Sequence, residues 1–145
     1  FIELAGEVNV EMPEHVVGML VRALDDRGKP VRGSRVLVLG LAYKKNVDDP
    51  RESPAFEVID RLLELGADVA YHDPFIPVAP SMRTWPHLPP LESVALSPDT
   101  LAASDAVVVV TDHDGVDYDL VAEHAPLVVD TRGVYREPRD NVVKA

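Results

Sequence analysis

Three short runs of Val and Leu constrain the fold of this chain more than any other feature of its sequence. They occupy residues 34–40, 106–111 and 127–130, and each is apolar at consecutive positions rather than at alternate ones. A strand with this pattern is buried on both faces, as the central strands of a parallel sheet are. The sequence therefore predicts a parallel sheet that is covered on both sides.

The rest of the chain alternates between helical and strand patterns. One further strand is expected at residues 68–72, and helices are expected at residues 53–66, 99–104 and 118–124. Strands that alternate with helices are joined by right-handed crossovers and pair in parallel. We therefore expect a doubly wound, mostly parallel, Rossmann-like α/β sheet with helices on both faces, in which ligands bind outside the carboxyl ends of the strands.

A helical segment precedes this sheet. From residue 1 to about residue 26, apolar side chains recur every three or four residues, which predicts an amphipathic helix. Pro13 interrupts the pattern, so either a second helix begins there or one long helix is kinked. Gly28 and the proline that follows it end the segment and place a boundary near residues 28–33. Because the chain opens with Phe1 directly in helical periodicity, we expect it to be part of a longer protein.

The segment from residue 74 to residue 98 has no sustained hydrophobic period. It carries seven of the 13 prolines and the one Trp of the chain. A proline-rich segment of this length predicts an irregular surface connection. We expect one short strand within it, near residues 94–96.

The charge of the chain limits its partners. The 25 Asp and Glu residues outnumber the 14 Lys and Arg residues, which gives a formal net charge of −11. A field of this sign repels nucleic acid and anionic membranes, so neither is expected as a partner. A phosphate-bearing ligand must therefore be held by a local group of cations or backbone N–H groups. No run approaches the ~18 apolar residues of a membrane span, and we expect a cytoplasmic protein.

The loop at residues 41–53 follows the first expected strand and is rich in charge. It lacks the second and third glycines of the Gly-x-Gly-x-x-Gly fingerprint, which disfavours a standard dinucleotide site. Lys44, Lys45 and Arg51, with the helix start at Ser53, form a candidate phosphate site whose cations are oriented by acidic side chains of the same loop. The alternative is an ordinary exposed loop that carries charges without a ligand.

Two further residues follow expected strands directly. Arg132 comes after the last strand, so its side chain is directed at the expected ligand crevice, and Gly133 permits close backbone approach. A helix-capping or ion-paired arginine is the alternative for Arg132. Asp73 follows the second strand, where nucleotide-binding folds often place the acid that binds a ribose hydroxyl. An Asp-Pro pair also opens turns, and that role is the alternative for Asp73.

His113 lies between Asp112 and Asp114, and the three resemble a metal or acid-base cluster. Three consecutive residues in regular structure do not all face one ion, and no second histidine lies at ligand spacing. We therefore expect a solvated turn here and no metal site. The chain has no cysteine and no serine in a nucleophile elbow, so no catalytic residue is expected within it.

Three motifs together resemble the UDP-glucose/GDP-mannose dehydrogenase family. They are residues 40–54 (Gly-Leu-Ala-Tyr-Lys-Lys-Asn-Val-Asp-Asp-Pro-Arg-Glu-Ser-Pro), residues 71–74 (Tyr-His-Asp-Pro) and residues 130–132 (Asp-Thr-Arg). Residues 1–32 are similar to the end of the family's central dimerisation helix with its linker, and residues 33–145 are similar to its UDP-binding C-terminal domain. The form of the motifs is closer to the branch that oxidises UDP-N-acetylglucosamine or UDP-N-acetylmannosamine than to the UDP-glucose branch.

The resemblance implies both what the chain does and what it lacks. Enzymes of the family oxidise C6 of the sugar from alcohol to carboxylate with two NAD, and their nucleophile is a cysteine thiolate. The NAD-binding domain and the cysteine would lie upstream of this chain, so the fragment alone is expected to be inactive. By resemblance, Lys44 and Arg132 contact the UDP-sugar and Arg51 contacts the NAD held by the missing domain. A homodimer is expected for the full-length protein.

Two alternatives to this function stay open. The chain is also compatible with the C-terminal domain of a UDP-glucose 6-dehydrogenase. A second alternative, of a different class, is a non-catalytic regulatory module that binds a nucleotide or another anion. All three functions use the same sheet and the same ligand edge, so the sequence pattern of the sheet does not separate them.

Overall fold

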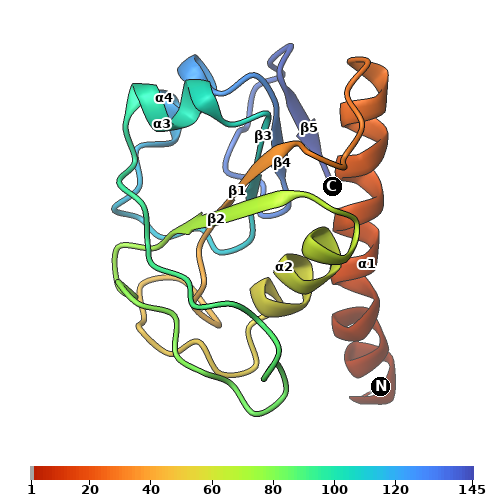
Figure 1. The fold of residues 1–145 in the computed structure, drawn as a ribbon, viewed down its shortest axis with the longest axis vertical. Coiled ribbons are helices and arrows are strands. Elements are labelled where there is room, and N and C mark those ends of the chain that lie inside the picture. Colours follow the sequence, from red (N-terminus) through yellow and green to blue (C-terminus); the bar gives the residue numbers. More distant parts are fainter. Residues whose placement is uncertain (1) are drawn as a thin grey trace.

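The computed structural model describes residues 2–145, and it describes the side chains of residues 12–145. Four helices and five strands follow one another in this part of the chain, as Figure 1 shows. Their bounds are α1 Ile2–Asp26, β1 Arg35–Leu39, α2 Ala55–Glu64, β2 Asp68–His72, α3 Pro98–Ala103, β3 Ala106–Val109, α4 Tyr118–His124, β4 Val128–Asp130 and β5 Val142–Lys144. Apart from the strand expected near residues 94–96, the expected elements are present, most of them within one or two residues of the expected bounds.

The five strands form one sheet in the order β2-β1-β3-β4-β5, and all four neighbouring pairs are parallel. This confirms the expected parallel sheet. In the registers, Leu39 at the end of β1 lies beside His72 of β2 and beside Val109 of β3. The three strands therefore end together, and the loops that follow them start from the same edge of the sheet.

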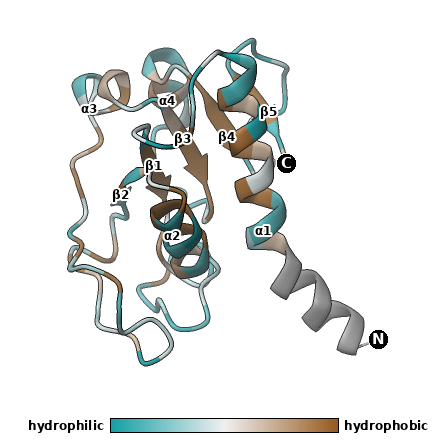
Figure 2. Cartoon of the chain, turned by 45° about the vertical axis from the view of Figure 1, so that its right-hand side comes forward, coloured by the Kyte–Doolittle hydropathy of each residue, from teal (hydrophilic) through white to brown (hydrophobic). Residues whose placement is uncertain are grey.

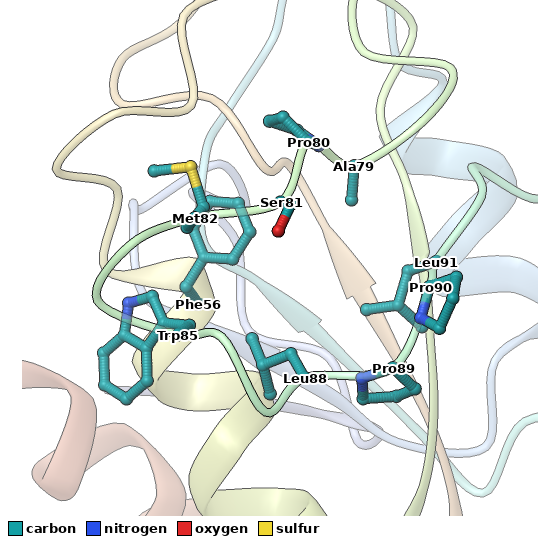
Figure 3. A pocket seen from close by; sticks show the side chains of 10 residues that line it. All are labelled: Phe56, Ala79, Pro80, Ser81, Met82, Trp85, Leu88, Pro89, Pro90 and Leu91. Atoms are coloured by element: carbon teal, nitrogen blue, oxygen red, sulfur yellow. The ribbon is translucent and has the colours of Figure 1, made fainter.

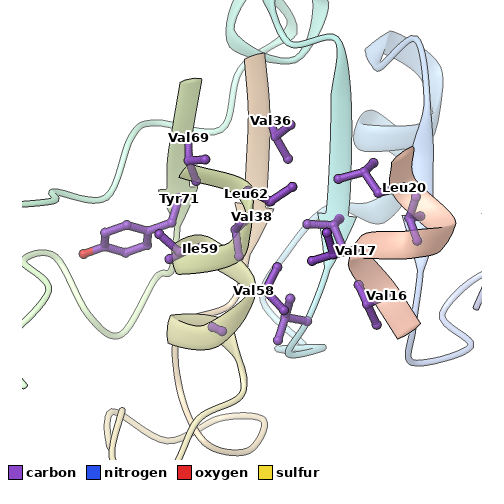
Figure 4. Close-up of a cluster of buried hydrophobic side chains, with 14 of the residues drawn as sticks. Val16, Val17, Leu20, Val36, Val38, Val58, Ile59, Leu62, Val69 and Tyr71 are labelled. Atoms are coloured by element: carbon purple, nitrogen blue, oxygen red, sulfur yellow. The ribbon is translucent and has the colours of Figure 1, made fainter. Parts of the chain in front are cut away.

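Helices cover both faces of the sheet, as expected for a doubly wound fold. On one face, α1 and α2 pack against each other and against alternate side chains of β1, β2 and β3, such as Val36 and Val38 (Figure 4). On the other face, α3 and α4 cover Leu37 and Leu39, the residues between them in β1. The central strands β3 and β4 are brown in the hydropathy view of Figure 2, and all of their residues are buried.

The N-terminal segment is one continuous helix, α1, and Pro13 lies inside it. The alternative of a second helix that begins at Pro13 is therefore wrong. Val16, Leu20 and Leu24 in the C-terminal half of α1 are buried against the sheet. The helix ends at Asp26, and Gly28 follows just past its end as expected, with a φ of +72° and an N–H that donates to the carbonyl of Asp25. Within residues 2–145, no helix combines the length and the apolar character needed to cross a membrane.

Two expectations about strands were wrong. Residues 94–96 form no strand; instead, isolated bridges join Ser93 to Tyr71 and Glu92 to Val78. Because the prolines of this segment have no N–H to donate, its backbone pairs only at these single bridges and forms no continuous ladder. The strand β5, Val142–Lys144, was not expected, because it is short and lies at the edge of the sheet, where its side chains are only partly buried.

Gly40 closes the contact between the loops that follow β1 and β3. Its φ is +92°, and a Cβ built at this position would lie 2.4 Å from Cβ of Thr111 and 2.5 Å from its carbonyl oxygen. Thr111 also donates a hydrogen bond of 2.7 Å from Oγ1 to the carbonyl of Ala42. The two loops therefore touch where they leave the sheet, and only glycine fits at position 40.

The buried carboxylate of Asp73, which follows β2, also binds the loop after β1 at the carboxyl edge of the sheet. Its Oδ2 accepts hydrogen bonds from the N–H groups of Leu41 at 2.7 Å and Ala42 at 3.1 Å, and its Oδ1 accepts one from Phe75 N–H at 2.8 Å. Burial alone would raise the pKa of Asp73, but the hydrogen bonds from Leu41, His113 and Phe75 outweigh it and lower the pKa. Of the two roles considered from the sequence, the turn is present, and the carboxylate is occupied by protein donors.

We predict that Gly40→Ala lowers the free energy of unfolding by about 3 kcal/mol or more, because a methyl group overlaps Thr111 at a positive φ. The matched control is Gly28→Ala, since Gly28 also has a positive φ but has nothing within 4 Å of its Cβ position. Backbone strain alone should cost this control about 1 kcal/mol. Chemical denaturation measures both losses, and equal losses would contradict a steric cause at Gly40.

We predict that Asp73→Asn lowers the free energy of unfolding by about 3 kcal/mol near neutral pH, because the amide replaces an acceptor that serves several buried donors. The folded-state pKa of Asp73 is lowered, so its contribution is complete above the unfolded pKa of about 3.9 and is lost as the pH falls through the folded value. Denaturation at a series of pH values should therefore show the two proteins converging in acid. A constant difference down to the acid limit would refute this role.

Candidate functional site

A groove of about 590 Å³ lies at the carboxyl edge of the sheet. Its wall includes Tyr43 from the loop after β1, Arg132 from the loop after β4 and Trp85 from the proline-rich segment. The other residues that line it are Met12 and Pro13 of α1, Glu52, Ser53 and Pro54 just before α2, Phe56 and Glu57 of α2, and Met82 and Thr84 of the proline-rich segment. The groove thus lies where a doubly wound sheet places its ligand, and one of the three expected site residues, Arg132, lines it.

Arg132 is placed by a buried carboxylate at the end of β4. Asp130 is 1% exposed, and its Oδ1 accepts hydrogen bonds from the N–H groups of Arg132 at 3.0 Å and Gly133 at 2.9 Å. Its Oδ2 accepts a hydrogen bond from Tyr135 N–H at 3.0 Å. The Arg132 side chain is half-exposed and its Nε lies 3.4 Å from Oδ1 of Asp112. Arg132 is therefore ion-paired and also lines the groove, while its contact with a ligand stays a prediction.

Lys44 and Arg51 do not line this groove, although they belong to the loop that borders it. Lys44 is exposed, and its ammonium lies 5.8 Å from the ring centroid of Tyr43, which does line the groove. Arg51 points to solvent with its side chain 80% exposed. Asp49 binds it through two contacts, Oδ1 to Nε at 3.0 Å and Oδ2 to Nη2 at 2.9 Å, so an acidic residue of the loop orients this cation, as the sequence suggested. The hydrogen bond from Arg51 lowers the pKa of Asp49 to about 2.

The start of α2 forms the floor of the groove. Ser53 is buried, donates from Oγ to the carbonyl of Ala42 at 3.2 Å and accepts from Ala55 N–H at 3.2 Å. The expectation that Ser53 is the N-cap was wrong: the helix begins at Ala55 with Pro54 as its N-cap, and no side chain caps it, although Ser53 binds the N–H of Ala55. The first N–H groups of a helix attract anions, while the carboxylates of Glu52 and Glu57 face the same groove. The site therefore offers cationic and anionic contacts side by side.

The expectation of a solvated turn at His113 was wrong. The His113 side chain is fully buried, and its Nε2 lies 2.9 Å from Oδ2 of Asp73. Its Nδ1 accepts a hydrogen bond from Asn46 N–H at 2.8 Å. The ring of Phe75 covers it, with the ring centroids 4.8 Å apart. Local sequence gave no sign of this burial, because the partners of His113 lie 40 and 67 residues away.

The segment Thr111–Asp114 connects the two halves of the candidate site. Thr111 and His113 bind the loop after β1, while Asp112 binds Arg132. Asp114 also accepts from the side chain of Asn46 at 2.7 Å. Sequence reasoning missed this organising role, and the one signal for it was a polar stretch directly after the strongest apolar run. Among the side chains that the structure describes, no group of three His, Asp or Glu residues is arranged to hold a metal ion.

A second, smaller pocket of about 180 Å³ adjoins the groove beneath the proline-rich segment (Figure 3). It is lined mainly by apolar side chains and shares Phe56, Met82 and Trp85 with the groove. His87 ties the same segment to α2, because its Nε2 lies 2.6 Å from Oδ1 of Asp60. The proline-rich segment therefore forms one wall of the candidate site without being regular in structure.

Comparison with curated proteins finds dehydrogenases of nucleotide sugars. The UDP-glucose 6-dehydrogenase of Haloferax volcanii is 35% identical over 136 residues, which cover 92% of this chain and 30% of that protein. The UDP-N-acetyl-D-mannosamine dehydrogenase of Methanococcus vannielii is 38% identical over 114 residues, which cover 79% of this chain and 24% of that protein. The chain therefore spans less than a third of the length of these relatives.

Solved structures give the same result for the fold. The chain matches the NDP-N-acetyl-D-galactosaminuronic acid dehydrogenase of Methanosarcina mazei with a TM-score of 0.77 and 31% identity, over 98% of this chain and 30% of that one. It matches the UDP-D-ManNAc dehydrogenase of Pyrococcus horikoshii with the same TM-score and 24% identity, over 99% of this chain and 32% of that one. The second likeness shows the shared fold alone.

The model of the UDP-binding domain of one family matches residues 37–137, which span β1 to the loop after β4. This match covers more than half of the chain and includes the whole carboxyl edge described above. Together with relatives at 35% and 38% identity, it agrees with the three motifs found in the sequence. The chain belongs to the UDP-glucose/GDP-mannose dehydrogenase family and contains its UDP-binding domain.

Proposed function

We propose that this chain is the UDP-sugar-binding part of an NAD-dependent UDP-N-acetylhexosamine 6-dehydrogenase, which oxidises the C6 alcohol of the sugar to a carboxylate. The observation that carries the proposal is the position of Arg132, which follows β4 directly and lines the groove at the carboxyl edge of a UDP-binding domain. A guanidinium suits a diphosphate, because it is always charged and donates several hydrogen bonds in one plane.

The groove offers each part of a nucleotide sugar a contact of the right chemistry. The diphosphate would lie between Arg132 and the first turn of α2. The carboxylates of Glu52 and Glu57 would accept hydrogen bonds from hydroxyl groups. The rings of Tyr43 and Trp85 offer flat surfaces for the base or the sugar. Lys44, next to Tyr43, is proposed to reach the sugar from the rim.

The remaining parts of the enzyme are proposed to come from outside this chain. The chain has no cysteine, so the thiolate nucleophile of the family must be supplied elsewhere in a longer protein. NAD supplies the oxidising power when it is bound, and most of its contacts would lie in the missing domain. Arg51 fits an additional contact, because Asp49 holds its guanidinium on one side while the side chain stays 80% exposed. We also propose that residues 1–32 continue into the dimerisation helix of that protein, and that it works as a homodimer in the cytoplasm.

The identity of the sugar is part of the proposal. The motif at residues 40–54 favours the N-acetylhexosamine branch, and several relatives carry that name. A UDP-glucose 6-dehydrogenase is the second candidate, because a relative of that name is 35% identical over 92% of the chain. Steady-state kinetics of the full-length protein with UDP-N-acetylglucosamine, UDP-N-acetylmannosamine and UDP-glucose decides between them through the ratio of kcat/KM values. A preference for UDP-glucose would replace the first proposal by the second.

We predict that UDP binds this chain and that Arg132→Ala weakens the binding by about 10-fold or more, because a charge-assisted contact to the diphosphate is lost. The matched control is Arg139→Ala. Arg139 is 43% exposed and pairs with Asp119 at 3.2 Å, whereas Arg132 is 46% exposed and pairs with Asp112 at 3.4 Å, but Arg139 is not among the residues that line the groove.

Calorimetry measures the affinity of all three proteins, and the fluorescence of Trp85, the one Trp of the chain, reports events in the groove. The control should bind UDP as the unchanged chain does. An equal loss in both variants would point to a general charge effect. A dissociation constant of about 1 mM corresponds to a binding free energy of about −4 kcal/mol, and no detectable binding at this concentration of UDP would favour the regulatory-module alternative.

We predict that Lys44→Ala and Arg51→Ala separate the two ligands in the full-length enzyme. Lys44→Ala should raise KM for the UDP-sugar or lower kcat, while KM for NAD stays unchanged. Arg51→Ala should raise KM for NAD by about 10-fold, because it removes the exposed guanidinium that we propose to contact the phosphates of NAD. Initial rates of NADH formation with each substrate varied in turn measure these constants. The same change in both variants would contradict the division of roles within the loop.

A further inference from the structure

His113 makes a buried connection between two loops of the candidate site, and the connection fixes the position of its proton. The N–H of Asn46 donates to Nδ1 at 2.8 Å, so Nδ1 carries a lone pair and no proton. The proton is therefore on Nε2, which donates to Oδ2 of Asp73 at 2.9 Å. Both side chains are fully buried. The folded structure thus requires a neutral imidazole with its proton on Nε2.

Asn46 is the point at which the loop after β1 is fastened. Its φ is +63°, a conformation that asparagine adopts more readily than most residues. Its side chain forms a reciprocal pair with Asp114, donating to the carboxylate at 2.7 Å and accepting from Asp114 N–H at 3.0 Å. Lys45 lies next to it, 3.9 Å from the same carboxylate, and Lys44 precedes both. The contact between Asn46 and His113 therefore helps to fix the backbone next to Lys44 and Lys45.

A second proton on His113 is incompatible with this arrangement. If Nδ1 gains a proton, two N–H donors face each other at an imidazole that is itself fully buried, and the loop must move away from the ring at Asn46. The bond from Nε2 to Asp73 would persist, because that carboxylate is ionised and accepts from several N–H groups.

The other groups around the ring do not remove this conflict. The carboxylates of Asp112 and Asp114 are engaged with Arg132 and with Asn46 and Lys45, respectively, and the Tyr118 hydroxyl donates to the carbonyl of His113 at 2.9 Å. The ring of Phe75, which packs on the imidazole, is not titratable. The donor–donor conflict at Nδ1 is therefore relieved by movement of the loop.

We propose that His113 is a positioning residue for the UDP-sugar site. In its neutral form it holds the loop after β1 in the conformation that presents Tyr43 and Lys44 to the ligand, and its protonation releases this loop and weakens binding. The effect on the ligand rests on the proposed function, whereas the clamp itself does not.

The clamp is tested first without any ligand. ¹⁵N NMR of the unchanged chain at about pH 8 should show His113 with an unprotonated Nδ1 and a protonated Nε2, and amide exchange at Asn46 should be protected. As the pH is lowered and Nδ1 gains its proton, the protection at Asn46 should fall by about tenfold, while the amide of Leu41 stays protected by Asp73. A proton on Nδ1 at pH 8, or unchanged protection at Asn46 once His113 is protonated, would overturn the proposal.

The consequence for binding is tested with UDP-N-acetylglucosamine. Its diphosphate is esterified at both ends, so it lacks the second phosphate ionisation near pH 6 that UDP has. The unchanged chain should bind it about tenfold more weakly at a pH where NMR shows Nδ1 protonated than at about pH 8. In His113→Asn, an amide carbonyl still accepts a bond from Asn46 N–H but gains no proton, so the affinity should no longer depend on pH.

The matched control is His124→Gln, which removes one histidine from the end of α4 and should keep the tenfold dependence. A pH dependence in His113→Asn equal to that of the unchanged chain would overturn the link to binding. If His113→Asn does not fold, the NMR measurement on the unchanged chain still decides whether the clamp exists. A clamp that behaves as described in a chain with no affinity at either pH would refute the proposed function and not the clamp.

Discussion

The arrangement of the candidate site depends on one buried carboxylate, Asp73. It accepts hydrogen bonds from the loop after β1, from the turn after β2 and from His113 after β3. A parallel sheet brings the carboxyl ends of its strands to one edge, but it does not by itself fix the loops that follow them. The ionised carboxylate fixes them, because leaving any of its buried donors without an acceptor costs about 1 to 3 kcal/mol.

This constraint gives a defined backbone position to an irregular loop of a dozen residues, whose side chains we propose to bind the ligand. The loop after β1 is held near its start by Asp73, in its middle by His113 and Asp114, and near its end by Ser53. Arg132, from the other side of β3, is bound to the same β3 loop through Asp112. The two sets of proposed ligand contacts are therefore positioned relative to each other through β3, although neither belongs to it.

The sequence predicted the parts of the fold that depend on burial of both faces, and it missed parts that depend on distant partners. Residues 106–111 could be read as a strand because their side chains are apolar at consecutive positions, whereas β5 has two partly buried valines and a lysine, which no pattern distinguishes from a loop. The position of Arg132 at the groove could be predicted because the residue directly follows a strand, and its contact with a ligand stays a prediction. The burial of His113 between polar neighbours depends on Asp73, 40 residues away, and no local pattern contains that information.

The same contacts reconcile a net charge of −11 with the proposed binding of a diphosphate. Several carboxylates of the carboxyl edge already accept hydrogen bonds from protein donors: Asp73 and Asp130 from backbone N–H groups, and Asp49 from Arg51. The carboxylates that face the groove are those of Glu52 and Glu57, next to Arg132 and the start of α2. A ligand that is anionic along its whole length would be repelled by these glutamates. A nucleotide sugar has its charge confined to the diphosphate and hydroxyl donors on either side, so its charge pattern matches the groove better than that of a simple polyanion.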